Sequence, residues 1–146
     1  EINAKMGLEK DNLVTIPLPD NMHCIPENSW ARVTDQGKVL VGIHHILLRC
    51  ANSIVSLEFP KIGEKKEQGE VCISITDARK RVHNLWMPVG GQVTAINEAF
   101  QDDYDRLFDD PYDQGWLLEV DPNQLEEDLK NLKSVRSDED LQHYIP

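Results

Sequence analysis

The sequence predicts a β-rich α+β domain, and three features of the chain indicate this. Several short segments alternate apolar and polar side chains, which is the period of a half-buried strand. Residues that favour turns, mainly Asp, Asn, Gly and Pro, separate these segments. Helical signals are confined to a short central segment and to the C-terminal part. At 146 residues, with 40% hydrophobic and 28% charged side chains, the chain is expected to form one globular domain with its own core.

The first two strands are expected at residues 30–33 and 38–43. Thr34-Asp35-Gln36-Gly37 between them is a good hairpin turn, because Asp and Gly tolerate the backbone angles that such turns require. Residues 44–51 read as a short helix that packs Ile46, Leu47 and Cys50 against the core.

Four further strands are expected along the chain, at residues 53–59, 71–76, 92–96 and 116–120. In the first of them Val55, Leu57 and Phe59 share one face, and Pro60 ends the strand. In the second, alternation directs Val71, Ile73 and Ile75 to one face and Cys72, Ser74 and Thr76 to the other.

The C-terminal part is expected to be helical. Asp121 is a good N-cap, Pro122 suits the first helical position, and a stripe of Leu125, Leu129 and Leu132 gives the helix an apolar face. A last short helix is expected to begin at residues 137–140. We expect a flexible arm or tag at residues 1–11, an extended segment at 16–19, and a single domain over residues 12–146.

The composition limits the classes of partner and the cellular compartment that can be expected. The net charge is −11, and a surface of this sign repels nucleic acids, so we expect protein partners instead. No apolar run is long enough to cross a bilayer, and the N-terminus lacks the pattern of a signal peptide. The three cysteines, Cys24, Cys50 and Cys72, have no metal-ligand spacing and favour a reducing cytoplasm. We expect a monomer.

Lys80 is the strongest candidate for a functional residue. It lies between the strand expected at 71–76 and the strand expected at 92–96, so we expect it at the tip of a hairpin with its amine in solvent. An amine held there suits a carrier, because it can bear a long prosthetic group that swings between enzymes. The alternative is a solvated turn lysine without a function.

Several short motifs, in order, resemble the glycine cleavage system H protein family. Trp30, the run Val41-Gly42-Ile43, and then Val55, Leu57, Pro60, Gly63 and Gly69 follow the order and intervals of that family. Further along, Pro88-Val89-Gly90-Gly91-Gln92-Val93 is similar to its "SPVSGEV" motif, Ile96-Asn97 to the "VN" after it, and Pro111-Tyr112-Asp113-Gln114-Gly115-Trp116 to its "PYxxGW" motif. The resemblance covers roughly residues 26–131 and implies a barrel-sandwich hybrid of antiparallel strands, of the lipoyl type, with a short central helix and C-terminal helices.

The resemblance also implies a site and a cofactor. Counted back from Pro88, Lys80 takes the place of the lysine in the family's "ESVKA" motif, and Asp77 takes the place of its Glu. Lys80 would therefore carry lipoate in amide linkage, and Asp77 would be recognised by the lipoate attachment enzyme. The chain itself would not be an enzyme, and its role would be to raise the effective concentration of the cargo at each partner.

The departures from the family pattern bear on which system the carrier serves. Between Gly69 and Pro88 the chain has one residue more than the family interval, so we expect a β-bulge between Gly69 and Asp77. In the competing register Arg79, which cannot be lipoylated, would take the place of the lysine.

Arg79 and Arg81 stand where the family has Val and Ala, and two guanidinium groups would attract an anionic sulfur cargo or an acidic docking site. With Ser29 in place of the Glu of "HEW" and residues 49–52 in place of "ELLG", they favour the lipoate-binding proteins of heterodisulfide-reductase-like sulfur oxidation systems. The alternative is an H protein that serves glycine decarboxylase, aminomethyltransferase and dihydrolipoamide dehydrogenase. The cysteines are left open as participants in either chemistry.

Other classes of site are less favoured. His44 and His45 are adjacent, so on a helix they would point to different sides, one packed and one exposed, and would chelate a metal poorly. The acidic run 102–110 lacks the glycine and the ligand spacing of a calcium loop. A scaffold without a prosthetic group remains a third hypothesis. If the chain is a carrier, we expect its arm to rest in a cleft among Trp86, the Cys50 helix and residues 112–116.

Overall fold

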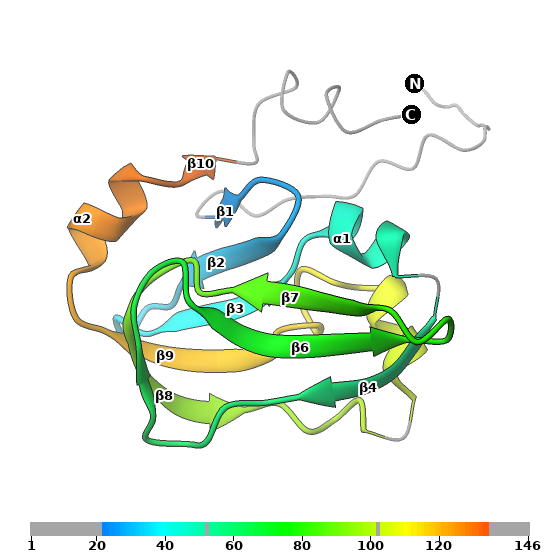
Figure 1. The fold of residues 1–146 in the computed structure, drawn as a ribbon. Helices are drawn as coiled ribbons and strands as arrows, with labels where there is room; N and C mark the ends of the chain where they lie inside the picture. The colour runs from blue at the N-terminus through cyan, green and yellow to red at the C-terminus, as the bar shows by residue number, and fades with distance from the viewer. Residues whose placement is uncertain (1–21, 52, 102, 135–146) are drawn as a thin grey trace.

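Two antiparallel β-sheets pack face to face in the computed structural model (Figure 1), which describes residues 22–51, 53–101 and 103–134. The predicted arm at 1–11, the extended segment at 16–19 and the last short helix at 137–140 lie outside the described residues. The prediction of a β-rich antiparallel domain with short helices is confirmed. None of the helices in the described ranges is long and apolar enough to span a membrane.

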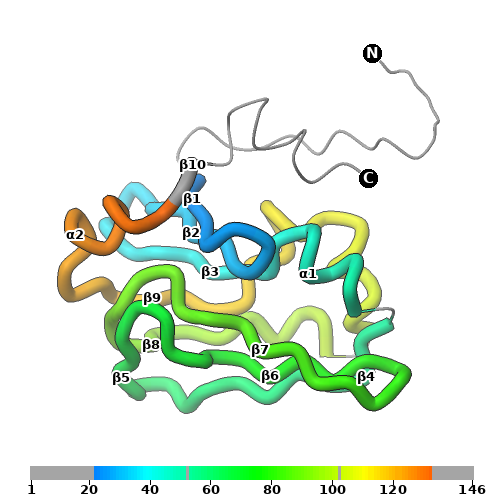
Figure 2. Tube along the Cα trace, turned by 45° about the horizontal axis from the view of Figure 1, so that its top comes forward, coloured from blue at the N-terminus to red at the C-terminus, as the bar shows by residue number. Residues whose placement is uncertain are grey.

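The larger sheet has the strand order β10-β1-β2-β3-β9-β8-β5 and the smaller sheet the order β4-β6-β7. The strands of the larger sheet are β1 Met22–Ile25, β2 Ser29–Val33, β3 Val39–Ile43, β5 Lys65–Lys66, β8 Gly91–Ile96, β9 Leu118–Pro122 and β10 Lys133–Ser134. Those of the smaller sheet are β4 Ile54–Glu58, β6 Val71–Asp77 and β7 Val82–Trp86. The helices are α1 His45–Cys50, the 3₁₀ helix η1 Tyr104–Phe108 and α2 Leu125–Lys130. Figure 2 shows the two layers, with the β6–β7 hairpin projecting at the end where α1 lies.

The core lies between the two sheets. Ile73, Ile75 and Leu85 of the smaller sheet are buried in one apolar cluster with Val41 and Leu118 of the larger sheet. Removal of this apolar surface from water is the main stabilisation of such a sandwich. The cluster fixes the smaller sheet on the larger one and therefore the direction in which the β6–β7 hairpin projects.

The β2–β3 hairpin forms as predicted, with its turn at Thr34–Gly37. Gly37 has φ +80°, and its N–H donates to the Thr34 carbonyl at 3.0 Å. On the strand that follows, Gly42 lies against the indole ring of Trp30, and a Cβ there would come within 2.4 Å of the ring. The Trp30 Nε1–H donates to the Pro111 carbonyl at 2.8 Å, so the ring cannot move away without losing a buried hydrogen bond. The glycine of the Val41-Gly42-Ile43 run is thus required by packing.

Two side chains join the smaller sheet to β2. The Asn28 Oδ1 accepts the Trp86 N–H at 2.8 Å, and its Nδ2 donates to the Asn84 carbonyl at 3.0 Å. The Ser29 hydroxyl donates to the Trp86 carbonyl at 2.7 Å. Both residues are buried, so these bonds form out of water and hold β7 close to the start of β2.

The smaller sheet contains two bulges that change which side chains are buried. In β6 the register with β7 shifts between Val71 and Ile73, which confirms the bulge expected between Gly69 and Asp77. As a result Cys72 and Ile73 are both buried and Val71 is exposed, so the simple alternation predicted for this strand was wrong at Val71 and Cys72. In β4 the register shifts between Ile54 and Ser56, and Val55 is 60% exposed rather than packed.

The helices differ from the prediction in detail. Asp121 and Pro122 do not begin a helix, because they pair with Gln92 and Gly91 and so extend β9; the helix begins at Leu125. The predicted stripe of Leu125, Leu129 and Leu132 does pack against the core. In α1 the buried residue is Leu48, whereas Ile46 and Leu47 are half-buried and Cys50 is exposed.

Candidate functional site

Lys80 lies in the turn between β6 and β7, and its side chain is exposed. Its backbone has φ +67°, a left-handed conformation that L-residues other than Gly, Asn and Asp rarely adopt. The turn is closed by hydrogen bonds from the Lys80 N–H to the Asp77 carbonyl and from the Asp77 N–H to the Arg81 carbonyl, each at 3.0 Å. Within the described part of the chain, the Lys80 amine makes no hydrogen bond or ion pair. The amine is therefore presented to solvent from a turn of defined geometry.

The Asp77 carboxylate holds this turn together from inside. Its Oδ1 accepts the backbone N–H groups of Arg79 and Arg81, both at 2.9 Å. Its Oδ2 accepts from the Arg81 Nε at 3.0 Å and lies 2.9 Å from the His83 Nε2. These four contacts, which we call the Asp77 clamp, fix the backbone on both sides of Lys80. The residue is 1% exposed, so its oxygen atoms face the hairpin rather than solvent.

The clamp favours the charged form of Asp77. The hydrogen bond from His83 and those from the Arg81 and Arg79 backbone outweigh the cost of burial and lower the pKa of the Asp77 carboxyl well below its usual range. The carboxylate is therefore ionised throughout the physiological range.

The turn is also tied to the body of the protein. The Ala78 N–H donates to the Ser53 carbonyl at 2.7 Å, and the Arg81 Nη2 donates to the Cys50 carbonyl at 3.0 Å. The Ser53 hydroxyl in turn lies 3.1 Å from the Asp105 carboxylate of η1, which also accepts the Ile54 N–H. The hairpin tip is therefore fixed to the C-terminal end of α1 and to the start of β4.

The two arginines beside Lys80 have different environments. Arg81 is occupied by Asp77 and by the Cys50 carbonyl, so its guanidinium group serves the hairpin. Arg79 is exposed, and its side chain makes no hydrogen bond or ion pair with the described residues. Of the predicted pair, only Arg79 has its guanidinium group fully available to a partner.

The clamp includes a residue that the sequence analysis missed. His83 pairs with Ile75 across the hairpin, and alternation puts His83 on the same face as Asp77. A hairpin register centred on residues 78–81 would have been enough to find it. Ser53 and Asp105 had no comparable signal, because their contribution depends on how η1 packs against β4.

The prediction that His44 and His45 point to different sides was wrong. Their rings are stacked with centroids 4.4 Å apart. The reason is that His44 is the N-cap of α1, with an extended backbone, and its Nδ1 accepts the Ile46 N–H. The Nδ1 of His45 contacts the Tyr112 hydroxyl. Among the described residues no group of His, Cys, Asp or Glu side chains is arranged to hold a metal ion.

Burial lowers the pKa of both imidazoles. The pKa of His44 falls to about 3, mainly through burial and then through the proximity of His45. The pKa of His45 falls to about 4, through burial and the charge of Arg49. Both rings are therefore neutral at physiological pH, and His44 is completely buried.

Of the three parts of the predicted cleft, one is α1 itself, and the other two, Trp86 and Tyr112, lie near its start. Tyr112 contacts His45 at the start of the helix, and Cys50 at its end accepts a hydrogen bond from the hairpin turn. Trp86 is bonded to Asn28, whose carbonyl accepts the His44 N–H. These contacts place Trp86 and Tyr112 close to α1. A cleft between them stays a prediction.

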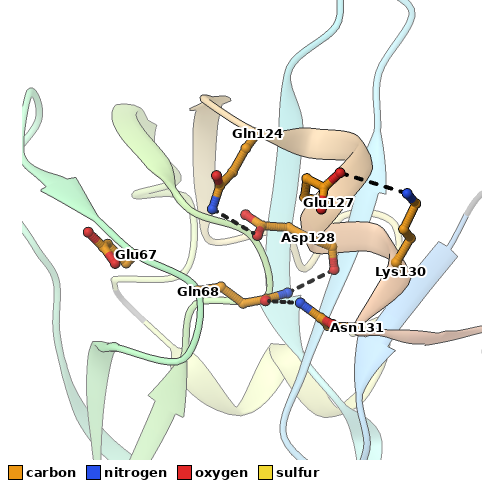
Figure 3. Close-up of a pocket in the computed structure, with 7 residues that line it drawn as sticks. All are labelled: Glu67, Gln68, Gln124, Glu127, Asp128, Lys130 and Asn131. Carbon is orange, nitrogen blue, oxygen red and sulfur yellow. Dashed lines mark hydrogen bonds and ion pairs between the residues drawn. The ribbon is translucent and has the colours of Figure 1, made fainter.

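A polar pocket that the sequence did not predict lies beside α2 (Figure 3). It has a volume of about 410 Å³ and is lined by Glu67, Gln68, Gln124, Glu127, Asp128, Lys130 and Asn131. The buried Asp128 carboxylate accepts the Gly90 N–H at 2.8 Å, and Gln68 bridges the Pro88 and Asp128 carbonyls. Figure 1 shows α2 at the opposite end of the molecule from the β6–β7 turn. These bonds join α2 to the β5–β6 connection. The polar side chains that line the pocket therefore have a structural role.

Comparisons with known proteins agree on one family. The family model for the glycine cleavage H-protein matches residues 22–144. A "Probable glycine cleavage system H protein" of Pyrococcus abyssi is 34% identical over 77% of this chain and 83% of its own length. The "Glycine cleavage system H protein" of Hydrogenovibrio crunogenus is 28% identical over 88% of this chain and 95% of its own. The crystal structure of a glycine cleavage system H protein from Mycobacterium marinum has a TM-score of 0.65 and 30% identity, covering 73% of this chain and 87% of that one.

The known properties of this family agree with the predictions made from the sequence. Its members are carrier subunits without catalytic activity, and they bear lipoate on a lysine. The family model matches most of the chain, and the relatives match over nearly their whole length. This chain belongs to the glycine cleavage H-protein family.

Proposed function

We propose that this chain carries lipoate in amide linkage on Lys80 and serves a glycine cleavage system. The observation that carries the assignment is the exposed Lys80 amine in a left-handed turn held by the buried Asp77 clamp. The bulge at Cys72 supports this register, because it absorbs the extra residue upstream and leaves Lys80 at the interval from Pro88 that the family motif implies. Arg79, the residue in the competing register, has no amine to acylate.

The residues around Lys80 fit attachment of lipoate. The Lys80 Nζ forms the amide bond with the carboxyl carbon of activated lipoate, and it loses a proton as the leaving group departs with the bonding electrons. Because the backbone on both sides is fixed, little conformational entropy is lost when an enzyme binds the turn. Once attached, lipoate supplies a dithiolane at the end of a long arm, which can take up a cargo or two electrons.

Glycine cleavage is favoured as the system because the relatives described above are named as probable or established glycine cleavage system H proteins. The partners would then be glycine decarboxylase, aminomethyltransferase and dihydrolipoamide dehydrogenase. All three cysteines are free thiols, which is consistent with the cytoplasm as the compartment.

Sulfur transfer in a heterodisulfide-reductase-like system is the second candidate, and one observation favours it. The exposed guanidinium group of Arg79 adjoins Lys80 and would attract an anionic sulfur cargo. Arg81 adds less to this attraction than Arg79, because its guanidinium group is already paired with the Asp77 carboxylate.

The site assignment predicts a single modification. After incubation with lipoate, ATP and a lipoate–protein ligase, the wild-type chain is expected to gain the mass of one lipoyl group, and peptide mapping is expected to place it on Lys80. Lys80→Arg keeps the charge of the turn and is expected to gain no mass, whereas Lys65→Arg, at an exposed strand position in the larger sheet, should be modified like the wild type. A lipoyl group on another residue, or none on the wild type, would contradict the proposal.

A reconstitution assay separates the two systems. The lipoylated chain is expected to support the release of CO₂ from glycine by glycine decarboxylase, with saturation at micromolar carrier. The unlipoylated Lys80→Arg chain provides the blank. If the lipoylated chain gives no more CO₂ than this blank but accepts sulfur from a persulfide donor, the second candidate replaces the first.

A further inference from the structure

The turn that carries Lys80 has the opposite charge to the chain as a whole, although the exposed Asp105 carboxylate lies nearby on Ser53. The net charge of the protein is −11, yet Arg79, Lys80 and Arg81 are consecutive and exposed in the turn. The nearest acidic residue in sequence, Asp77, is buried and fully engaged by the clamp, so it adds no exposed negative group. A cationic spot of this kind on an acidic protein gives the molecule a strongly directional field.

Arg49 is another exposed cation near the hairpin turn, and its charge also acts on His45 at the start of α1. It lies in the last turn of α1 and is exposed. The carbonyl of the next residue, Cys50, accepts a hydrogen bond from Arg81 at 3.0 Å, so the end of α1 lies beside the hairpin turn. Because the contact is with the backbone, this arrangement depends on the fold and not on the side chain of Cys50.

Exposed apolar side chains adjoin the cations. Val82 is 61% exposed and Val55 is 60% exposed, whereas the other apolar side chains of β4, Ile54 and Leu57, are buried. Thr76 pairs with Val82 on one side and with Ser56 on the other, which places both valines at the Lys80 end of the smaller sheet. Val55 is turned outward by the bulge in β4.

We propose that Arg49, Arg79, Val55 and Val82, which we call the tip surface, are the docking site for the enzyme that attaches lipoate, and that this enzyme presents acidic side chains around an apolar contact. The proposal rests on Lys80 as the attachment site. An attachment enzyme must bring the activated carboxyl carbon within bonding distance of the Lys80 Nζ, so it must cover the residues beside Lys80. A later partner meets the far end of the arm and need not cover them.

The charge distribution explains how such an enzyme would find the right face. An acidic entrance is attracted by the tip surface and repelled by most of the remaining surface of a chain of net charge −11. Encounters at the tip surface are therefore favoured over encounters at other faces of the protein. The main effect is a higher rate constant for association. Arg81 is not included, because its guanidinium group holds Asp77.

The test measures lipoate attachment by a purified ATP-dependent lipoate–protein ligase that modifies the wild-type chain. Arg79→Glu is expected to raise the KM for the unmodified chain about tenfold at low salt and to leave kcat within about twofold. In about 0.5 M NaCl the difference should shrink to about twofold, because screening weakens contacts between exposed charges. Lys61→Glu is the matched control: it makes the same change in net charge at an exposed residue between β4 and β5, and its KM should stay within about twofold of the wild type.

The apolar part of the tip surface has its own variant. Val82→Ser is expected to raise KM about fivefold without the dependence on salt. Ile62→Ser is its control, since Ile62 is 64% exposed but lies in the β4–β5 connection.

Binding of the ligase to the Lys80→Arg chain, which cannot be modified, separates this proposal from the assignment of Lys80. The tip surface is supported if Arg79→Glu weakens this binding about tenfold while Lys61→Glu does not. Equal effects of Arg79→Glu and Lys61→Glu, or an effect of Arg79→Glu only on a later partner, overturn it. If the wild type is modified at a residue other than Lys80, the assignment of Lys80 is wrong. If ligase binding is also unaffected by Arg79→Glu, the tip surface is wrong as well.

Discussion

Replacing Asp77 with alanine is expected to lower the rate of lipoate attachment to Lys80 by about tenfold to a hundredfold, because the backbone on both sides of Lys80 loses its common acceptor. Without the carboxylate, the Arg79 and Arg81 N–H groups, the Arg81 guanidinium group and His83 all lose a partner. The left-handed conformation at Lys80 is then no longer enforced, and the amine samples many positions. The effect should appear mainly in kcat, since the reacting atom is displaced and the docking residues are retained.

Two variants show whether Asp77 acts through the turn. Asp77→Asn keeps an oxygen for the backbone N–H groups but lacks the charge, so its rate should lie between those of the wild type and Asp77→Ala. Asp35→Ala, in the turn of the β2–β3 hairpin, should attach lipoate at the wild-type rate. Hydrogen exchange at the Arg79 and Arg81 amides should accelerate in Asp77→Ala and not in Asp35→Ala. A normal attachment rate with accelerated exchange would mean that the ligase orders the turn itself.

The pH range of the clamp follows from the direction of the pKa shift. The pKa of Asp77 is lowered in the folded protein, so its contribution to stability is complete above the usual aspartate value of about 4 and declines as the pH falls below it. Lipoate attachment near neutral pH is therefore not limited by protonation of Asp77.

The free energy of unfolding is expected to fall by roughly 1.5 kcal/mol between pH 6 and pH 5, because of His44 and His45. The pKa values of these imidazoles are about 3 and about 4 in the folded protein and about 6.5 in an unfolded chain. Their contribution is thus complete above pH 6.5 and is lost as the pH falls, since the unfolded chain binds protons that the folded protein does not. The larger share comes from His44, which is fully buried, because solvent screens the half-buried His45.

Urea unfolding at pH 7, 6 and 5 measures this loss. His44→Asn should reduce it by more than half, because the asparagine oxygen can still accept the Ile46 N–H as an N-cap but does not titrate. Gln36→Ala, at an exposed side chain that does not titrate, is the control and should lose as much stability between pH 6 and pH 5 as the wild type. An unchanged loss in His44→Asn would show that its ring is not the group that takes up the proton.

The place of Lys80 at the tip of a hairpin was predicted, but the strand expected to close that hairpin, at residues 92–96, was wrong. β7, at Val82–Trp86, closes the hairpin, whereas residues 91–96 form β8 of the larger sheet. The one-residue excess upstream was visible in the sequence and appears as the bulge at Cys72. The bulge at Val55 had no such signal, because it depends on how β4 aligns with β6. The start of the C-terminal helix failed for a similar reason: the capping signal at Asp121 and Pro122 is strong, but pairing with β8 satisfies the Asp121 backbone in a strand.

The chemistry around Lys80 was only partly predictable. The sequence assigned Asp77 to recognition by an attachment enzyme, and that role stays a prediction; the structure adds that its carboxylate is turned inward on Arg81 and His83. Arg79 and Arg81 looked equivalent in sequence because they flank the same lysine. They differ because only Arg81 reaches Asp77 and the Cys50 carbonyl, and such reach is set by the three-dimensional turn.

The bonds from Asn28 and Ser29 to β7 have a consequence for association between molecules. Among the strands that the structure describes, β7 pairs with β6 alone, so its other side is an edge that another chain could join by strand addition. The amide of Asn28 and the hydroxyl of Ser29 occupy the Asn84 and Trp86 backbone groups that such an intruding strand would need. A carrier that has to detach from each enzyme in turn is thereby protected from pairing with itself.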